Sequence, residues 1–204
     1  YRKLYNLYQP FLLSLFSVKL TVNGLDKIPT DSNFVLLQNH VSNVDPIVTN
    51  YVLEKTPLIF ATKKDSFRTP IIGKLMKGLG YIKLERKSGL EDASEIMRAV
   101  NLINDGEISL AIYPEGTRNK TFPNPILLDF KEQIFAIIKK TKKPIVISVI
   151  QGNEQIKKNL LFKKHKVNVN FYKIIEPEEY CDLSPAQLSE VVKNHMCEIL
   201  IKNN

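Results

Sequence analysis

A histidine and an aspartate lie five positions apart in residues 39–46, which read NHVSNVDP. Each helical residue turns by about 100°, so a regular helix would rotate these two side chains about 140° from each other. His40 and Asp45 therefore cannot share a helix face, but a turn between a strand and a helix can fold Asp45 back onto the imidazole. A carboxylate bound to the Nδ1–H group would fix the tautomer and leave Nε2 free to act as a base.

The same pattern has a simpler interpretation. Pro46 suits the first turn of a helix, so Asp45 could be a helix cap and His40 an ordinary loop histidine. Both interpretations place a strand before the pair and a helix after it. The spacing alone leaves a catalytic base and a structural turn as alternatives.

A second group of reactive residues occupies positions 113–119, which read YPEGTRN. A strand that enters a Pro/Gly turn can present backbone N–H groups and a bidentate guanidinium to a phosphate. We expect Arg118 to bind the phosphate and Glu115 to orient Arg118 or a substrate hydroxyl. The alternative is a surface turn with an exposed ion pair.

A third segment, residues 63–87, concentrates the positive charge of the chain. It holds eight lysines and arginines against Asp65 and Glu85, a net charge of +6 out of the +8 of the whole chain. Apolar residues at 70–79 make its predicted helix amphipathic, which is typical of a membrane-surface helix. Such a run is also commonly a solvated face.

Seven strand-like runs, several of them continuously apolar, predict strands, and helical patterns separate most of them. The alternation predicts an α/β single domain with a mostly parallel central sheet of about seven strands, flanked by helices. Ligands of such sheets bind beyond the carboxyl ends of the strands. The predicted strands are residues 19–23, 33–38, 57–61, 81–84, 108–113, 144–150 and 166–175. The predicted helices run from Pro70 to Gly80, from a capping box at Ser88–Glu91 to Gly106, and from Ser184 to near Ile201.

Length and composition narrow the class of protein. The chain has 204 residues, 44% of them apolar, which is enough for one domain with a hydrophobic core. Its two cysteines, Cys181 and Cys197, exclude a disulfide framework and a four-thiolate zinc site, and we expect reduced thiols in a cytosol-facing protein. The three histidines have no metal-ligand spacing, so we expect no metal.

The N-terminal segment is apolar but short. Residues 11–18 hold six apolar side chains interrupted by Ser14 and Ser17, and a spanning helix needs about 20 apolar residues. We therefore divide the domain, residues 1–204, into a membrane-associating helix at 1–18 and a catalytic core at 19–204. The alternative is that the first helix simply covers the core.

The three segments occur in an order that resembles the 1-acyl-sn-glycerol-3-phosphate acyltransferase family, from about Gly24 to Ile150. The resemblance implies that His40 is the catalytic base and Asp45 its orienting carboxylate. It implies further that the acceptor phosphate is bound by Lys63 and Arg86 from the second motif and by Glu115, Gly116, Thr117 and Arg118 from the third.

The resemblance also implies the reaction and its setting. A fatty-acyl group would pass from an acyl thioester, acyl-CoA or acyl-carrier protein, to the sn-2 hydroxyl of lysophosphatidic acid, giving phosphatidic acid without a further cofactor. Backbone N–H groups near His40 would stabilise the oxyanion. The protein would lie at the cytoplasmic face of the cell membrane as a peripheral or monotopic protein, on an anionic membrane surface.

Three alternatives remain at this stage. A related lysophospholipid or glycerol-3-phosphate acyltransferase would share the histidine motif. Covalent catalysis would use Ser42 or a cysteine, although Ser42 lacks a Gly-x-Ser-x-Gly elbow. A nucleic-acid-binding protein would use the basic cluster at 157–166, but the sequence has no recognisable nucleic-acid-binding motif, so we expect no nucleic-acid partner.

Overall fold

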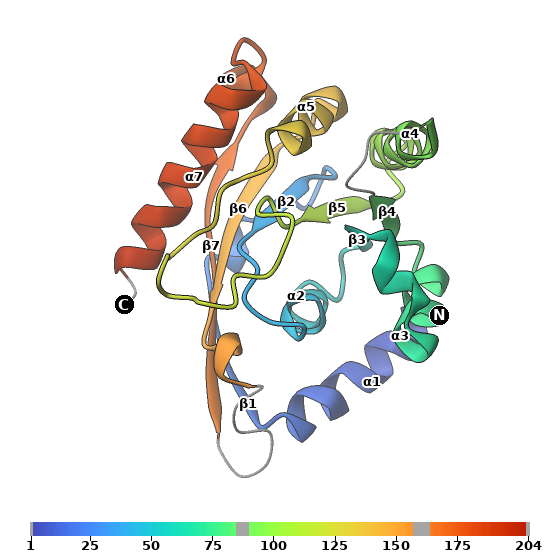
Figure 1. The fold of residues 1–204 in the computed structure, drawn as a ribbon, viewed down its shortest axis with the longest axis vertical. Helices are drawn as coiled ribbons and strands as arrows, with labels where there is room; N and C mark the ends of the chain where they lie inside the picture. Colours follow the sequence, from blue (N-terminus) through green and yellow to red (C-terminus); the bar gives the residue numbers. More distant parts are fainter. Residues whose placement is uncertain (1, 85–89, 157–163, 203–204) are drawn as a thin grey trace.

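A seven-stranded sheet, ordered β1-β7-β6-β2-β5-β3-β4, runs through the centre of the chain (Figure 1). The computed structural model describes residues 2–84, 90–156 and 164–202. Paired strands are parallel except for β6 and β7, which are antiparallel. The strands are β1 Val18–Asn23, β2 Val35–Gln38, β3 Leu58–Lys63, β4 Ile82–Leu84, β5 Ser109–Ile112, β6 Ile145–Gln151 and β7 His165–Ile175. The predicted α/β class is confirmed, and each predicted strand is present with ends within two residues.

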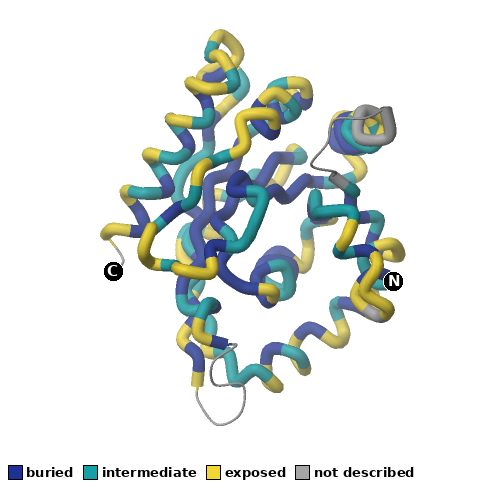
Figure 2. Tube along the Cα trace, in the orientation of Figure 1, coloured by how far each residue is buried: buried dark blue, intermediate teal, exposed yellow. Residues whose placement is uncertain are grey.

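The central strands are buried on both faces. Every residue of β2, β5 and β6 is buried, which explains why these strands are almost continuous apolar runs in the sequence. Figure 2 shows this buried centre, with exposed positions on the outer helices and loops. Edge strand β1 instead alternates between half-buried and exposed residues.

Helices cover both faces of the sheet. Helices α4, α5 and α7 lie on one side, where α7 packs on β6 and α5, whereas α1 and α2 pack together on the other (Figure 1). The helices are α1 Arg2–Leu15, α2 Asp45–Val52, α3 Pro70–Gly78, α4 Leu90–Asn104, α5 Glu132–Thr141, α6 Pro177–Tyr180 and α7 Pro185–Lys202.

The predicted helix starts and stops are largely present. Helix α7 opens with a reciprocal cap, because the Gln187 N–H donates to Ser184 Oγ at 3.2 Å and the Ser184 N–H donates to Gln187 Oε1 at 2.8 Å. Helix α4 ends two residues before Gly106, as predicted. The proposed cap residue Ser88 lies outside the described residues.

Two features differ from the sequence-based expectation. Helix α5 was not predicted, because its N-cap Lys131 provides no capping side chain and its apolar stripe is short. The N-terminal helix ends at Leu15, and Val18 already belongs to β1, so the core begins slightly before the predicted boundary.

Gly152, directly after β6, is required by a close backbone approach. Its φ is +91°, and a Cβ atom there would lie 1.9 Å from the Lys166 carbonyl oxygen on β7. Gly80 has a similar φ of +77°, but a Cβ atom there would meet nothing within 4 Å. Comparing substitutions at the two glycines therefore distinguishes the free-energy cost of a left-handed backbone from that of a steric clash.

We expect Gly152→Ala to lower the free energy of unfolding clearly more than Gly80→Ala. The left-handed conformation costs a side chain about 1–2 kcal/mol at either position, and only the substitution at Gly152 would also displace backbone. Equilibrium urea denaturation of the two variants measures the difference. Equal losses would contradict the close approach between β6 and β7.

Candidate active site

The first and third sequence motifs lie at the same edge of the sheet. Strands β2 and β5 are parallel neighbours, and β3 is the parallel neighbour of β5. Their register pairs Leu37 with Ile112 and Phe60 with Ala111. The segments that follow these strands therefore leave the sheet side by side, at the carboxyl ends where ligands of α/β sheets bind.

The predicted contact between His40 and Asp45 is present. His40 Nδ1 lies 2.8 Å from Asp45 Oδ2, and the aspartate is fully buried whereas 17% of the histidine side chain is exposed. The same oxygen accepts the backbone N–H groups of Val41 and Ser42, each at 2.8 Å. Both backbone donors come before Asp45 in the chain, whereas a capping side chain accepts N–H groups that follow it. Asp45 thus folds back onto the turn before α2 and does not cap the helix.

These hydrogen bonds occupy some of the backbone N–H groups near His40, and an oxyanion role for the others stays a prediction. The backbone N–H groups of Val41 and Ser42 donate to Asp45, and that of His40 donates to Glu115. Three amides that could have faced an oxyanion therefore already hold the turn together. Ser42 is buried, and its hydroxyl accepts the Val44 N–H at 3.3 Å.

An aromatic ring fixes the plane of the imidazole. Tyr113, the residue after β5, stacks on His40 with ring centroids 4.0 Å apart and an interplanar angle of 11°. Its hydroxyl is buried and has no hydrogen-bond partner among the described residues. Burial, together with the nearby Asp45 charge, raises the pKa of Tyr113 well above its usual value. The ring therefore acts at neutral pH as an uncharged platform for His40.

Glu115 has a different position from the one predicted. Its Oε1 accepts the His40 N–H at 2.8 Å, its Oε2 accepts the Leu128 N–H at 2.9 Å, and only 1% of the residue is exposed. Burial raises the pKa of Glu115, and the two backbone donors partly offset this rise. The expected contact of Glu115 with Arg118 or a substrate is thus replaced by a structural one that ties the 119–131 loop to the histidine turn.

The rest of the third motif forms an accessible turn beside His40. Gly116 has a φ of +62°, which favours glycine, and Thr117 and Arg118 are half-buried. The turn is anchored next to the catalytic candidate, because the Asn119 N–H donates to the His40 carbonyl oxygen at 2.7 Å.

The second motif is only partly placed. Lys63 is the last residue of β3 and half-buried, so it lies at the same edge of the sheet as the His40 turn. Arg86 lies outside the described residues. The phosphate-binding roles predicted for the other motif residues stay predictions, namely those of Lys63, Arg86, Gly116, Thr117 and Arg118.

Two asparagines to which the sequence analysis gave no role join β6 to this turn. Asn39 donates from Nδ2 to the Ile150 carbonyl oxygen at 3.0 Å and accepts the Ile150 N–H at 2.8 Å. Asn153, in the 3-10 helix Asn153–Gln155 after β6, donates from Nδ2 to Asp45 Oδ1 at 2.9 Å. The sequence gives one indication of the role of Asn153, because this asparagine follows Gly152 at the end of the buried strand β6.

Within the described segments, no three His, Cys, Asp or Glu side chains are grouped so that they could hold a metal ion. No described helix combines the length and the hydropathy needed to cross a membrane.

Comparison with known proteins identifies the family of the chain. Residues 19–151 match the protein family described as Acyltransferase. The chain belongs to the acyltransferase family. The matched region contains both residues of the His40–Asp45 pair and the whole 113–118 turn, and it ends two residues before Asn153.

Similar acyltransferases come from distant organisms. A 1-acyl-sn-glycerol-3-phosphate acyltransferase of Borreliella burgdorferi is 24% identical over 92% of this chain and 74% of its own length. One of Cocos nucifera is 28% identical over 83% of this chain and 54% of its own length. The chain thus spans between about half and three quarters of these two relatives.

The fold is also that of a solved acyltransferase. The crystal structure of the 1-acyl-sn-glycerophosphate (LPA) acyltransferase PlsC from Thermotoga maritima superposes with a TM-score of 0.78. The superposition covers 98% of this chain and 78% of that one, at 19% sequence identity.

Replacing Glu115 by Gln should destabilise this acyltransferase by about 1–3 kcal/mol, the cost of an unpaired buried polar group. The amide can accept only one of the two backbone N–H groups and turns an N–H donor toward the other. Chemical denaturation measures the loss, with the exposed Glu107→Gln as the control. A Glu115→Gln variant as stable as the control would rule out the bridging role.

Proposed function

We propose that this acyltransferase transfers a fatty-acyl group from an acyl thioester to the sn-2 hydroxyl of lysophosphatidic acid, giving phosphatidic acid for phospholipid synthesis. The names of the similar acyltransferases support this substrate. The observation that carries the proposal is the buried Asp45 carboxylate on His40 Nδ1, next to a turn that contains Arg118.

The chemistry is a direct acyl transfer. His40 Nε2 takes the proton of the sn-2 hydroxyl while that oxygen attacks the thioester carbonyl carbon. The new C–O bond forms, the C–S bond breaks, and the proton on His40 passes to the departing thiolate. Asp45 stabilises the imidazolium in between, and proton transfer of this kind contributes about 10²–10⁴-fold in rate.

The position of Ser42 favours direct transfer over a covalent intermediate. Its hydroxyl is buried and accepts a hydrogen bond from the Val44 N–H. A serine nucleophile instead needs its hydroxyl hydrogen-bonded to the base and open to the substrate. Cys181 and Cys197 lie in the C-terminal part of the chain, beyond the family match.

Substrate binding follows from the same arrangement. Arg118 and Lys63, with Arg86 and Thr117, would hold the acceptor phosphate, and Gly116 would let the backbone of the turn approach it. Fixing the phosphate would bring the hydroxyl to His40, and positioning of this kind supplies several kcal/mol of the barrier. The donor would be acyl-CoA or acyl-carrier protein, and no further cofactor is needed for this reaction.

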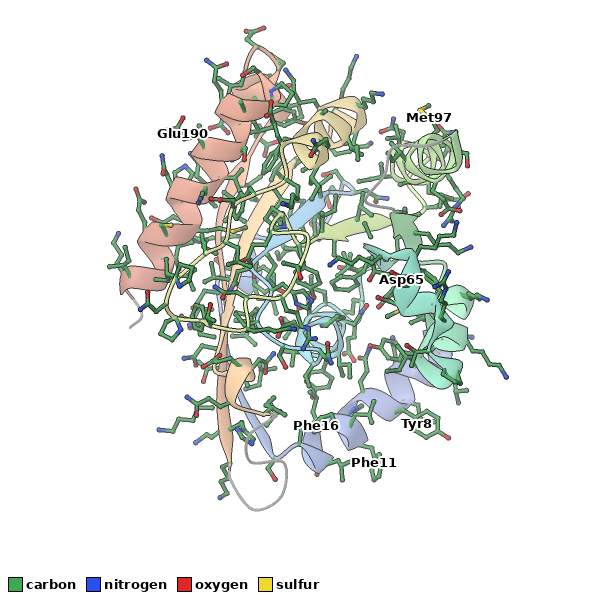
Figure 3. The ribbon with its side chains drawn as sticks, viewed as in Figure 1. Tyr8, Phe11, Phe16, Asp65, Met97 and Glu190 are labelled. Carbon is green, nitrogen blue, oxygen red and sulfur yellow. The ribbon has the colours of Figure 1, made fainter. Side chains whose placement is uncertain are left out.

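An apolar stripe on α1 supports contact with a membrane. Its inner face, Tyr5, Gln9 and Leu13, is buried, so the helix also covers the core. The outer face carries large exposed side chains at helical spacing, and Tyr8 and Phe11 point away from the body of the protein (Figure 3). This face consists of Leu4, Leu7, Tyr8, Phe11 and Leu15, which are 54–72% exposed.

Basic residues lie on α3, whose Lys74 and Lys77 are exposed beside the exposed Ile72. An apolar stripe and basic side chains together suit the headgroup region of an anionic bilayer. We propose that the protein lies as a peripheral or monotopic protein on the cytoplasmic face of the cell membrane. The basic cluster at 157–166, considered above for nucleic acid, lies mostly outside the described residues.

Flotation with anionic liposomes tests the membrane proposal. Phe11→Ser should reduce the floating fraction several-fold, because it removes about 2 kcal/mol of apolar transfer free energy. Ile201→Ser on α7 is the matched control, since Ile201 is 65% exposed and Phe11 64%. Equal flotation of both variants would contradict binding through α1.

His40→Ala should abolish acyl transfer while the protein stays folded. The measurement is turnover of purified protein with a panel of lysolipids and glycerol 3-phosphate, each with acyl-CoA and with acyl-carrier protein. Circular dichroism shows whether the fold is kept. A folded His40→Ala variant that retains more than about a tenth of wild-type turnover would overturn the assignment of the base.

A further inference from the structure

The second oxygen of the Asp45 carboxylate has its own donor. Oδ2 receives His40 and the two backbone N–H groups of the turn, whereas Oδ1 receives Asn153 Nδ2 at 2.9 Å. Both Asp45 and Asn153 are fully buried. A carboxylate can rotate about its Cβ–Cγ bond, and donors on both oxygens define its plane.

Contacts with the sheet hold Asn153 in place. It follows Gly152, whose N–H donates to Glu154 Oε2 at 2.8 Å and whose left-handed φ lets the chain pass close to β7. Strand β6 in turn pairs with β2, and Asn39 fixes the Ile150 backbone. The amide of Asn153 therefore reaches Asp45 from the sheet, while Asp45 itself belongs to α2.

We propose that Asn153 is a positioning residue for proton transfer: its amide orients and partly neutralises the Asp45 carboxylate, so that Oδ2 stays aligned with His40 Nδ1. The inference rests on the proposed acyl transfer through His40. Asn153 lies beyond residue 151, where the family match ends. It acts through Asp45 and does not touch the reacting atoms.

The environment of Asn153 favours this role over a purely stabilising one. Its Oδ1 is buried without a hydrogen-bond partner in the described part of the chain. A buried polar atom left unpaired destabilises the fold, so an asparagine is a poor choice here for stability alone. Its value lies in the donor that it presents to Asp45.

The titratable groups around the pair define what a pH profile would report. Besides His40 and Asp45, these groups are Tyr113 and Glu115 from the end of β5 and Glu154 next to Asn153. The Glu115 and Glu154 carboxylates accept backbone N–H groups. Asn153 Nδ2 is the hydrogen-bond donor to Asp45 Oδ1. Replacing Asn153 by Asp therefore places a new titratable group next to the His40–Asp45 pair.

The test is Asn153→Asp, which keeps the shape and replaces the amide donor by a carboxyl oxygen. Two buried carboxyl groups at hydrogen-bond distance share one proton until the pH exceeds the raised pKa of the pair. Asp45 then carries less negative charge, and kcat at neutral pH should fall by about tenfold or more. The acceptor KM should stay unchanged, and kcat relative to that of the wild type should recover at alkaline pH, where both carboxyl groups are ionised.

Two further variants separate positioning from stability. Asn153→Ala removes the donor without adding a carboxyl group, so it should lower kcat several-fold without the alkaline recovery. Tyr180→Phe removes a hydrogen bond far from the site, that from the buried Tyr180 hydroxyl on α6 to the Lys143 carbonyl oxygen at 2.8 Å. It should lose stability but keep the wild-type kcat and pH profile. If Asn153→Asp does not fold, the comparison of Asn153→Ala with Tyr180→Phe decides.

The outcomes are distinct from a failure of the proposed function. An active His40→Ala variant would overturn the acyl-transfer mechanism itself. An inactive His40→Ala variant, combined with Asn153 variants that keep wild-type kcat and pH profile or that change only the acceptor KM, would overturn the positioning role alone.

Discussion

The candidate site is built around the buried Asp45 carboxylate. A buried carboxylate is strongly unfavourable unless hydrogen bonds replace its hydration. Here the donors are the His40 imidazole, two backbone N–H groups of the preceding turn and the Asn153 amide. The charge can therefore exist only when the β2–α2 turn and the segment after β6 are both in place.

Pairing of the central strands brings the β2–α2 turn and the segment after β6 together. Gln38 Nε2 donates to Ser148 Oγ at 3.0 Å and Gln38 Oε1 accepts the Thr49 hydroxyl at 2.8 Å, so one buried side chain links β2, β6 and α2. Asn39 adds two hydrogen bonds to the backbone of β6. A site fixed by paired central strands on a packed core is more precise than one carried by loops.

The parts of the fold that depend on local pattern could be predicted from the sequence. The buried strands β2, β5 and β6 follow apolar runs, and the Ser184–Gln187 capping box marks the start of α7. The turn of Asp45 onto His40 was one of the two interpretations that their spacing allowed. Helix α5 was not predicted because no capping residue marks its start in the sequence.

Contacts set by strand order could not be predicted. The bond from Asn153 to Asp45 joins residues 108 positions apart and requires β6 to lie next to β2. The contacts of Glu115 could not be predicted for the same reason. Its proximity to Arg118 in the sequence suggested a contact between the two side chains. In the fold, its carboxylate accepts two backbone N–H groups, one of them on the His40 turn. No local pattern contains that information.

The central claim is that Asp45 selects the His40 tautomer that leaves Nε2 as the base. Nitrogen NMR of protein labelled at its three histidines reads the tautomer directly, and the spectrum without His40 assigns the signal. With the imidazole neutral, the account predicts a proton on Nδ1 and none on Nε2, and a mixture of tautomers once Asp45 is replaced by Ala. A wild-type His40 ring that carries its proton on Nε2 would contradict it.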